Sequence, residues 1–232
     1  MLTWLGAGNA FPPVEKALKE PNGLLAAGGD LSAARLLEAY RRGIFPWYAG
    51  GEPLLWWSPD PRMVLYCAEL KIPRSLAKNL RNKGYEVRVD SAFSKVLKHC
   101  AEPRKIEKNT WLGKEMQAAY LALHQAGHAH SFETWRQGDL VGGLYGVAVG
   151  RMFYGESMFS RATDASKVAL VHLVAYLKER GFPLIDCQMK TPLLASLGGR
   201  EVPRRAFLRQ VAGLVNYAEP SGKWTMRTLG AA

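Results

Sequence analysis

The sequence has 232 residues, of which 48% are hydrophobic and 22% are charged, and this composition excludes a wholly disordered, collagen-like or low-complexity chain. With 31 lysines and arginines against 20 aspartates and glutamates, the net charge is +11. We therefore expect an anionic partner, namely a nucleic acid, a membrane surface or an acidic ligand; a basic surface without a specific partner is the alternative. No stretch approaches the roughly 20 apolar residues that would span a bilayer, so we expect no membrane-spanning segment.

The N-terminus and the cysteines indicate the cellular compartment. Residues 1–10 carry no lysine or arginine ahead of a short apolar run, so they do not resemble a secretory signal. The three cysteines, Cys67, Cys100 and Cys187, are too few and too scattered for a disulfide framework. We therefore predict a cytoplasmic protein with reduced thiols.

Residues 1–62 are interpreted as a small N-terminal domain that is rich in turns and aromatic residues. One clear helix is predicted over residues 32–42, with Ser32 or Asp30 at its N-terminal cap and Gly43 at its end. The prolines that follow this helix are expected to prevent regular strand pairing and to hold the chain in an extended, rigid path.

Residues 63–232 are interpreted as a second domain in which helices and strands alternate. The predicted helices cover residues 74–83, 92–99, 112–126, 165–180, 192–197 and 203–215. The predicted strands cover residues 85–89, 129–135, 140–149, 152–158 and 184–188, the middle three at hairpin spacing. Helices, an antiparallel meander, a buried helix and a further strand predict an α+β fold.

Positive charge is concentrated in the first part of this second domain. Residues 63–110 contain 11 basic and 5 acidic side chains, whereas residues 1–62 contain 6 of each. Because screening limits each charge to about 8 Å at physiological salt, such clustering matters more for an anionic partner than the total charge.

The strand at residues 184–188 is the first candidate site. Side chains alternate along a strand, so Asp186 and Gln188 are expected on one face and Cys187 on the other, as a core thiol. A carboxylate two residues from an amide can orient that amide at a site. The alternative is a strand end at which Asp186 caps the following helix.

Glu156 is the second candidate, because Phe153, Met158 and Phe159 give it an apolar neighbourhood. A carboxylate in such surroundings is either paired or has a shifted pKa, and both favour a functional site. The alternative is an ion pair between Glu156 and Arg161 that holds the turn.

Seven tryptophans form the third signal. Four of them lie outside the periodic elements, namely Trp47, Trp56, Trp57 and Trp111. Indole rings beside basic residues suit stacking on unpaired nucleobases, while packing between the domains is the alternative for each. We expect no metal site, because no cysteine or acidic cluster completes the histidines at positions 124, 128 and 130.

Several motifs together resemble the leucyl/phenylalanyl-tRNA–protein transferase family over residues 11–207. They are EPNGLLAAGGDL (20–31), GIFPW (43–47), WWSPDPR (56–62), HAHS (128–131), LVGGLYGV (140–147), GESMFSR (155–161), LIDCQ (184–188), SLG (196–198) and PRR (203–205). The resemblance implies a second domain like that of GCN5-related N-acetyltransferases, with a mainly antiparallel sheet, and no cofactor.

The resemblance also implies a reaction. Leu or Phe, and less readily Met, is moved from its aminoacyl-tRNA to the N-terminal Arg or Lys of an acceptor protein. A peptide bond forms, and the product carries an N-degron. The implied partners are the aminoacyl-tRNA and the acceptor protein, with no membrane, and we expect a monomer.

Site residues are implied by matching positions. The family's catalytic pair matches Asp186 and Gln188, and its acidic residue near the acceptor matches Glu156. In the family's mechanism Asp186 polarises Gln188; an amide is a very weak base, so we expect Gln188 to orient the acceptor amine. The apolar pocket for the transferred side chain maps to Leu144, Phe153, Met158, Leu170, Leu173 and Ile185.

Matching positions also give the residues that would contact tRNA and the positions at which this sequence differs from its relatives. The resemblance implies that Trp47 and Trp111 stack on the terminal adenosine, and that basic residues hold the acceptor-stem phosphates, namely Arg74, Lys78, Arg81 and Lys83. Leu193 stands where relatives usually carry His, while Leu144 and Leu173 keep the pocket apolar.

Two rival functions compete with this one. A coenzyme A acetyltransferase would need a basic, glycine-containing pyrophosphate loop, and residues 160–175 contain none. A non-catalytic tRNA-binding module would need only the basic patch.

Overall fold

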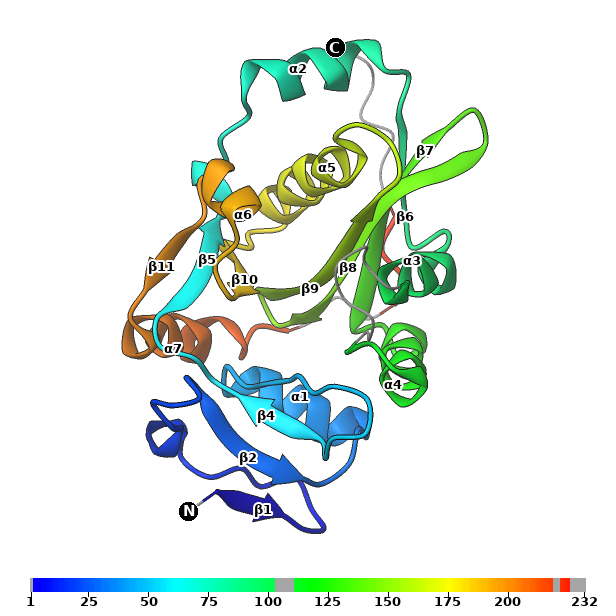
Figure 1. The fold of residues 1–232 in the computed structure, drawn as a ribbon. Coiled ribbons are helices and arrows are strands. Elements are labelled where there is room, and N and C mark those ends of the chain that lie inside the picture. Colours follow the sequence, from blue (N-terminus) through cyan, green and yellow to red (C-terminus); the bar gives the residue numbers. More distant parts are fainter. Residues whose placement is uncertain (1, 103–110, 219–221, 226–232) are drawn as a thin grey trace.

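The computed structural model describes residues 2–102, 111–218 and 222–225, which fold into two sheets with helices packed around them (Figure 1). Within these residues no helix has both the length and the apolarity to cross a membrane. All three cysteines are free, as predicted.

The N-terminal sheet has the strand order β1-β2-β4-β3. Its strands are β1 (Thr3–Leu5), β2 (Leu24–Gly28), β3 (Phe45–Pro46) and β4 (Leu55–Trp57), and only the pairing of β1 with β2 is parallel. A short 3-10 helix, η1 (Val14–Lys16), precedes β2. Our expectation that prolines prevent strand pairing here is wrong, because Pro46 lies at the end of the two-residue edge strand β3, where its missing N–H is tolerated.

Helix α1 (Ala33–Arg41) follows β2 as predicted. The Ser32 hydroxyl accepts a hydrogen bond from the Arg35 backbone N–H at 3.4 Å, which satisfies one free donor of the first turn. Gly43 has a φ of 67°, the left-handed conformation that ends the helix and that glycine adopts without strain.

The second sheet has seven strands in the order β11-β5-β10-β9-β8-β7-β6. They are β5 (Arg62–Tyr66), β6 (Glu86–Val89), β7 (Ala129–Arg136), β8 (Asp139–Val149), β9 (Met152–Ser160), β10 (Leu184–Gln188) and β11 (Arg200–Val202). Every pairing is antiparallel except that of β9 with β10. The sequence analysis predicted all of these strands apart from β5 and β11, so the α+β fold with a mainly antiparallel sheet is confirmed.

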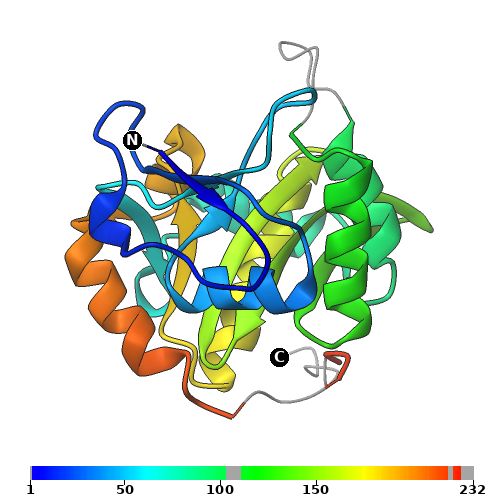
Figure 2. The same ribbon diagram turned by 90° about the horizontal axis from the view of Figure 1, so that it is seen from below.

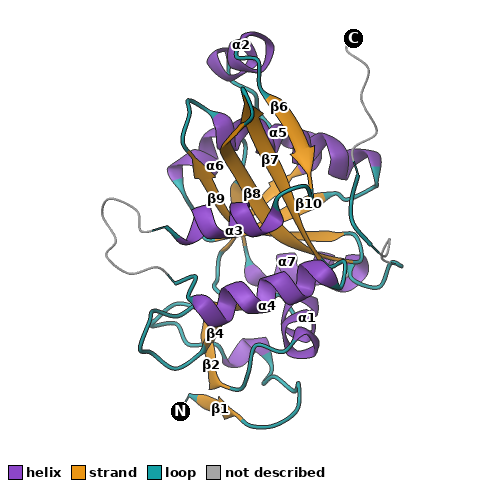
Figure 3. Ribbon diagram, turned by 90° about the vertical axis from the view of Figure 1, so that its right-hand side faces the viewer, coloured by secondary structure: helices purple, strands orange, loops and turns teal. Residues whose placement is uncertain are grey.

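Two layers of helices cover the second sheet (Figures 1 and 3). The remaining elements are η2 (Cys67–Glu69), α2 (Arg74–Asn82), α3 (Phe93–Ala101), α4 (Lys114–Gln125), α5 (Ala165–Glu179), α6 (Pro192–Ser196) and α7 (Arg204–Leu214). One hydrophobic cluster joins α5 and α2 to alternate strand residues such as Leu144 and Phe153. The other joins α1, α3, α4 and α7 to their neighbours, such as Tyr145 and Tyr154, as the period of two in a strand requires.

The N-terminal sheet shares its core with the second of these clusters, which also contains Phe11, Leu25 and Trp56. Figure 2 shows the N-terminal segment lying across the larger sheet, between α7 and α4. The two parts of the chain are therefore packed together around common apolar side chains.

Candidate functional site

The parallel strands β9 and β10 pair at only two positions, Ile185 with Phe153 and Asp186 with Tyr154. Beyond these residues β9 remains paired with β8 as far as Ser160, and β10 remains paired with β5. A cavity of about 900 Å³ opens where the pairing ends, and residues of both strands line it.

The inner part of the cavity is apolar. Leu144 of β8, Leu170 of α5 and Ile185 of β10 are each at most 4% exposed, and they form its walls. All six side chains implied by the resemblance line this part, namely Leu144, Phe153, Met158, Leu170, Leu173 and Ile185. They converge because alternate residues of the strands face α5, which presents Leu170 and Leu173 from one face.

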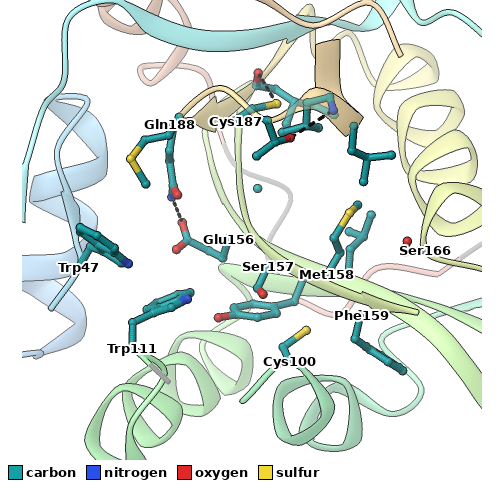
Figure 4. A pocket seen from close by; sticks show the side chains of 18 of the residues that line it. Trp47, Cys100, Trp111, Glu156, Ser157, Met158, Phe159, Ser166, Cys187 and Gln188 are labelled. Carbon is teal, nitrogen blue, oxygen red and sulfur yellow. Dashed lines mark hydrogen bonds between the residues drawn. The ribbon is translucent and has the colours of Figure 1, made fainter. Parts of the chain in front are cut away.

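The polar end of the cavity is built around Glu156. In the pairing of β8 with β9, Tyr145 faces Ser157 and Gly146 faces Gly155, so Glu156 is the extra residue of a β-bulge. Its carboxylate accepts hydrogen bonds from the Tyr120 hydroxyl at 2.6 Å and the Tyr40 hydroxyl at 2.9 Å. It also accepts one from Gln188 Nε2 at 3.1 Å (Figure 4).

Removal from bulk water raises the pKa of Glu156 to about 7, although the hydrogen bonds from the two tyrosines act in the opposite direction. The expectation of a shifted pKa therefore holds. The alternative ion pair with Arg161 is wrong, because Arg161 binds Glu102 at 2.7 Å instead. Glu156 can therefore exchange a proton near neutral pH.

Gln188 ends β10 with a φ of 61°, in the left-handed region, where the pairing of β10 with β5 shifts register. This irregularity breaks the alternation of side chains. Gln188 and Cys187 both line the cavity, and Asp186 lies behind it. The prediction that Asp186 and Gln188 share one face of the strand is therefore wrong, and Cys187 is a half-buried wall residue rather than a core thiol.

Asp186 is fully buried and forms a two-point ion pair with Arg62, at 2.8 Å to Nε and 2.6 Å to Nη2. The Arg62 guanidinium lies between the rings of Phe45 and Phe207, at 4.8 and 4.7 Å from their centroids. Asp186 also accepts the backbone N–H of Gln188 at 2.9 Å. It does not cap the next helix, because Thr191 accepts the N–H of Leu194 in that role.

The tryptophans divide into two groups. Trp47 and Trp111 lie on one side of the cavity, near Glu156 and Gln188, and Trp47 is 40% exposed (Figure 4). Trp57 also lines the cavity and packs edge-on against Trp47, with ring centroids 5.6 Å apart. Trp56 is fully buried against Phe11, so the packing alternative holds for that residue.

The basic residues and histidines lie elsewhere. The side chains of Arg74, Lys78, Arg81 and Lys83 are exposed on α2 and its C-terminal cap, and none of the four lines the cavity. The further basic residues at positions 104, 105 and 108 lie outside the described part of the chain. His124 stacks on Phe93, and across the described residues no group of side chains is suited to hold a metal ion.

Three side chains of the site were missed by the sequence analysis, namely Tyr40, Tyr120 and Arg62. The two tyrosines lie on the buried faces of α1 and α4, where a tyrosine is indistinguishable from a core residue until its hydroxyl partner is known. Arg62 was seen only as the last residue of the WWSPDPR motif.

Comparison with known proteins identifies the family. The protein-family model described as leucyl/phenylalanyl-tRNA protein transferase matches residues 64–212. The family model of the N-terminal domain of the same transferase matches residues 29–60. The leucyl/phenylalanyl-tRNA–protein transferase of Chromobacterium violaceum is 60% identical over 224 residues, which cover 97% of this chain and 96% of that one. The transferase of Thiobacillus denitrificans is 63% identical over 215 residues, 93% and 94% of the two chains.

Similar solved structures share little sequence. FemX is 12% identical with a TM-score of 0.45, covering 78% of this chain and 71% of FemX. The ribosomal-protein-alanine N-acetyltransferase of Brucella melitensis biovar Abortus 2308 is 13% identical with a TM-score of 0.36, covering 62% of this chain and 99% of that one. By the family models and by its close relatives, the chain belongs to the leucyl/phenylalanyl-tRNA–protein transferase family.

Proposed function

We propose that the cavity between β9 and β10 is where this enzyme transfers Leu or Phe, and less readily Met, from aminoacyl-tRNA to the N-terminal Arg or Lys of an acceptor protein. The observation that carries the proposal is the continuity of one cavity, in which an apolar pocket adjoins the Glu156–Gln188 pair and two tryptophans. Membership of the leucyl/phenylalanyl-tRNA–protein transferase family removes the two rival functions, a coenzyme A acetyltransferase and a non-catalytic tRNA-binding module.

The apolar pocket suits the donor side chain. Its walls offer contact area without polar partners, so Leu, Phe and Met all bind, and discrimination among them is only about 1–3 kcal/mol. In this proposal Trp47 and Trp111 hold the terminal adenosine by stacking, which is worth about 1–3 kcal/mol for a base.

The polar end suits the acceptor amine. The nitrogen of the amine attacks the ester carbonyl, a C–N bond forms, and the bond from the carbonyl carbon to the ribose oxygen breaks. The amine loses a proton and the ribose oxygen gains one. Ionised Glu156 can attract the cationic acceptor and take this proton, because its pKa of about 7 is close to the working pH.

Gln188 orients the amine in this scheme. Its amide nitrogen is engaged by Glu156, which leaves its amide oxygen to accept a hydrogen bond from the attacking amine. Asp186 is a positioning residue, because it contacts only the backbone N–H of Gln188 at this site and is neutralised by Arg62. An aminoacyl ester is already reactive, so orientation alone lowers the barrier by several kcal/mol.

Exposed basic residues of α2 would hold tRNA phosphates, and binding would weaken as salt is added. The enzyme would act in the cytoplasm as a monomer, and its products would enter the N-degron pathway. We also propose that residues 1–62 and residues 63–232 form the two domains of the chain.

The test is transfer of labelled Leu from Leu-tRNA to peptides that differ only at residue one, Arg against Ala. A third peptide carries Arg with an acetylated amine and is the matched control. We expect product with the free Arg peptide alone. Equal transfer to the Arg and Ala peptides would refute the acceptor assignment, and transfer to the acetylated peptide would refute the attack by the amine.

A further inference from the structure

Trp224 lies beyond the end of the matched family model at residue 212, yet it is only 4% exposed. Its indole stacks on the His130 ring, with centroids 3.8 Å apart and planes 8° apart, and on Tyr176 of α5 at 4.9 Å. Its backbone N–H donates to the Asp90 carboxylate at 2.8 Å, and His130 Nδ1 binds the same oxygen at 2.8 Å. These contacts hold Trp224 inside the second domain.

Phe153 connects Trp224 to the donor pocket. The Phe153 ring lines the cavity, and its centroid is 5.9 Å from that of Trp224, within the range of aromatic contacts. A Cβ atom at Gly146 would lie 2.5 Å from the Phe153 ring, so the ring also lies directly against the backbone of β8. The ring therefore lies against both the backbone of β8 and Trp224.

We propose that Trp224 is a positioning residue that sets the depth of the donor pocket through Phe153. The inference rests on the proposed function, because it needs the pocket to hold the transferred side chain. Removing the indole leaves a space behind Phe153 into which the ring can shift, since a packed interior has few voids of its own. A deeper pocket accommodates the longer Phe side chain better than the shorter Leu side chain.

The experiment compares the ratio of kcat/KM for Phe-tRNA to that for Leu-tRNA in Trp224→Ala and in the parent enzyme. We expect the ratio to rise about three- to tenfold, no more than the roughly tenfold minimum for one methylene group in an apolar pocket, because the change acts through Phe153. Trp4→Ala is the matched control, because Trp4 is 67% exposed, and we expect its ratio to stay at the parent value. Added indole should lower the ratio of Trp224→Ala again, because an apolar cavity binds a ring of matching size.

A second pair of variants separates this inference from the proposed function. Leu173→Ala changes the pocket wall directly and must alter the same ratio if the pocket holds the donor. A changed ratio in Leu173→Ala with a parent-like ratio in folded Trp224→Ala would overturn the role of Trp224 and leave the donor pocket in place. Parent-like ratios in both variants would overturn the donor pocket itself.

Trp224→Phe covers the case in which the alanine variant does not fold. Its smaller ring leaves a smaller space, so we expect a ratio about twofold above the parent value, with the melting temperature recorded beside it. A parent-like ratio in folded Trp224→Phe, when Trp224→Ala is unfolded, would overturn the inference, because a residue that only stabilises the fold changes stability and not selectivity.

Discussion

The apolar pocket and the polar end of the cavity meet between the same two strands, but different kinds of backbone build them. The pocket walls come from regular strand and helix positions, such as Leu144 on β8 and Leu170 on α5. The polar end comes from irregular positions, because Glu156 is the extra residue of a bulge and Gln188 has a left-handed backbone. Regular packing therefore makes a pocket with broad apolar preference, while local irregularities aim the two polar side chains at one point.

The largest expected effect comes from breaking the support of the polar end. Arg62→Ala leaves Asp186 buried without its cationic partner, so we expect a loss of about 3–5 kcal/mol in the free energy of unfolding. Urea titration measures this loss. The exposed pair of Arg200 with Glu69 provides the control, and Arg200→Ala is expected to cost less than about 1 kcal/mol. Equal losses of unfolding free energy in Arg62→Ala and Arg200→Ala would show that the buried ion pair does not support the fold.

Glu156→Gln is expected to lower kcat/KM by about 100-fold or more at pH 8, the scale of general acid–base catalysis. In the parent enzyme kcat/KM should rise with pH through about 7 as Glu156 ionises, and the variant should lack this rise. The acceptor amine also titrates near pH 8 in both enzymes, so the difference between their pH profiles isolates Glu156. If kcat/KM rises with the same midpoint pH in both enzymes, Glu156 is not the group that takes the proton.

Glu156→Gln should stabilise the folded protein at pH 8, although it lowers activity there. The pKa of Glu156 is raised in the folded state, so folding holds its proton between about pH 4.5 and 7, and stability falls as pH rises through this window. At pH 8 the loss is about 2–3 kcal/mol for a shift of this size in a partly buried group. We therefore expect Glu156→Gln to be the more stable enzyme at pH 8 and to lose this pH dependence. Unfolding titrations at pH 4.5 and pH 8 measure the difference.

The contrast between the two ends also explains what could be predicted from the sequence. Hydrophobic periodicity located α5 and the three-stranded meander to within a few residues, because packing against one face imposes a period that the residues record. The bulge at Glu156 and the left-handed Gln188 leave no such record, so the orientation of Asp186 was predicted wrongly. Strands of two or three residues, such as β3 and β11, are too short to show a period at all.

Trp47 and Trp111 lie near Glu156 and Gln188, and Trp111→Ala tests whether Trp111 stacks on the terminal adenosine. Loss of one stacking face is worth about 1–3 kcal/mol, so we expect KM for aminoacyl-tRNA to rise about 5- to 100-fold, with kcat little changed. Trp4→Ala serves as the exposed control. An unchanged KM would remove the stacking role and leave Trp111 as a wall of the cavity.

The smallest expected effect lies outside the cavity, on α2. A phosphate contact contributes to the salt dependence of binding, and each lost contact lowers the slope of log K against log salt by about 0.7–0.9. Lys78→Ala combined with Arg81→Ala should therefore weaken tRNA binding only several-fold at physiological salt and reduce this slope by up to about 2. The matched control replaces two exposed lysines of the N-terminal part, Lys16 and Lys19, and should leave the slope unchanged. Because the α2 residues do not line the cavity, transfer at saturating tRNA should be unaffected, and a lower kcat would show that α2 acts on the reaction and not on docking alone.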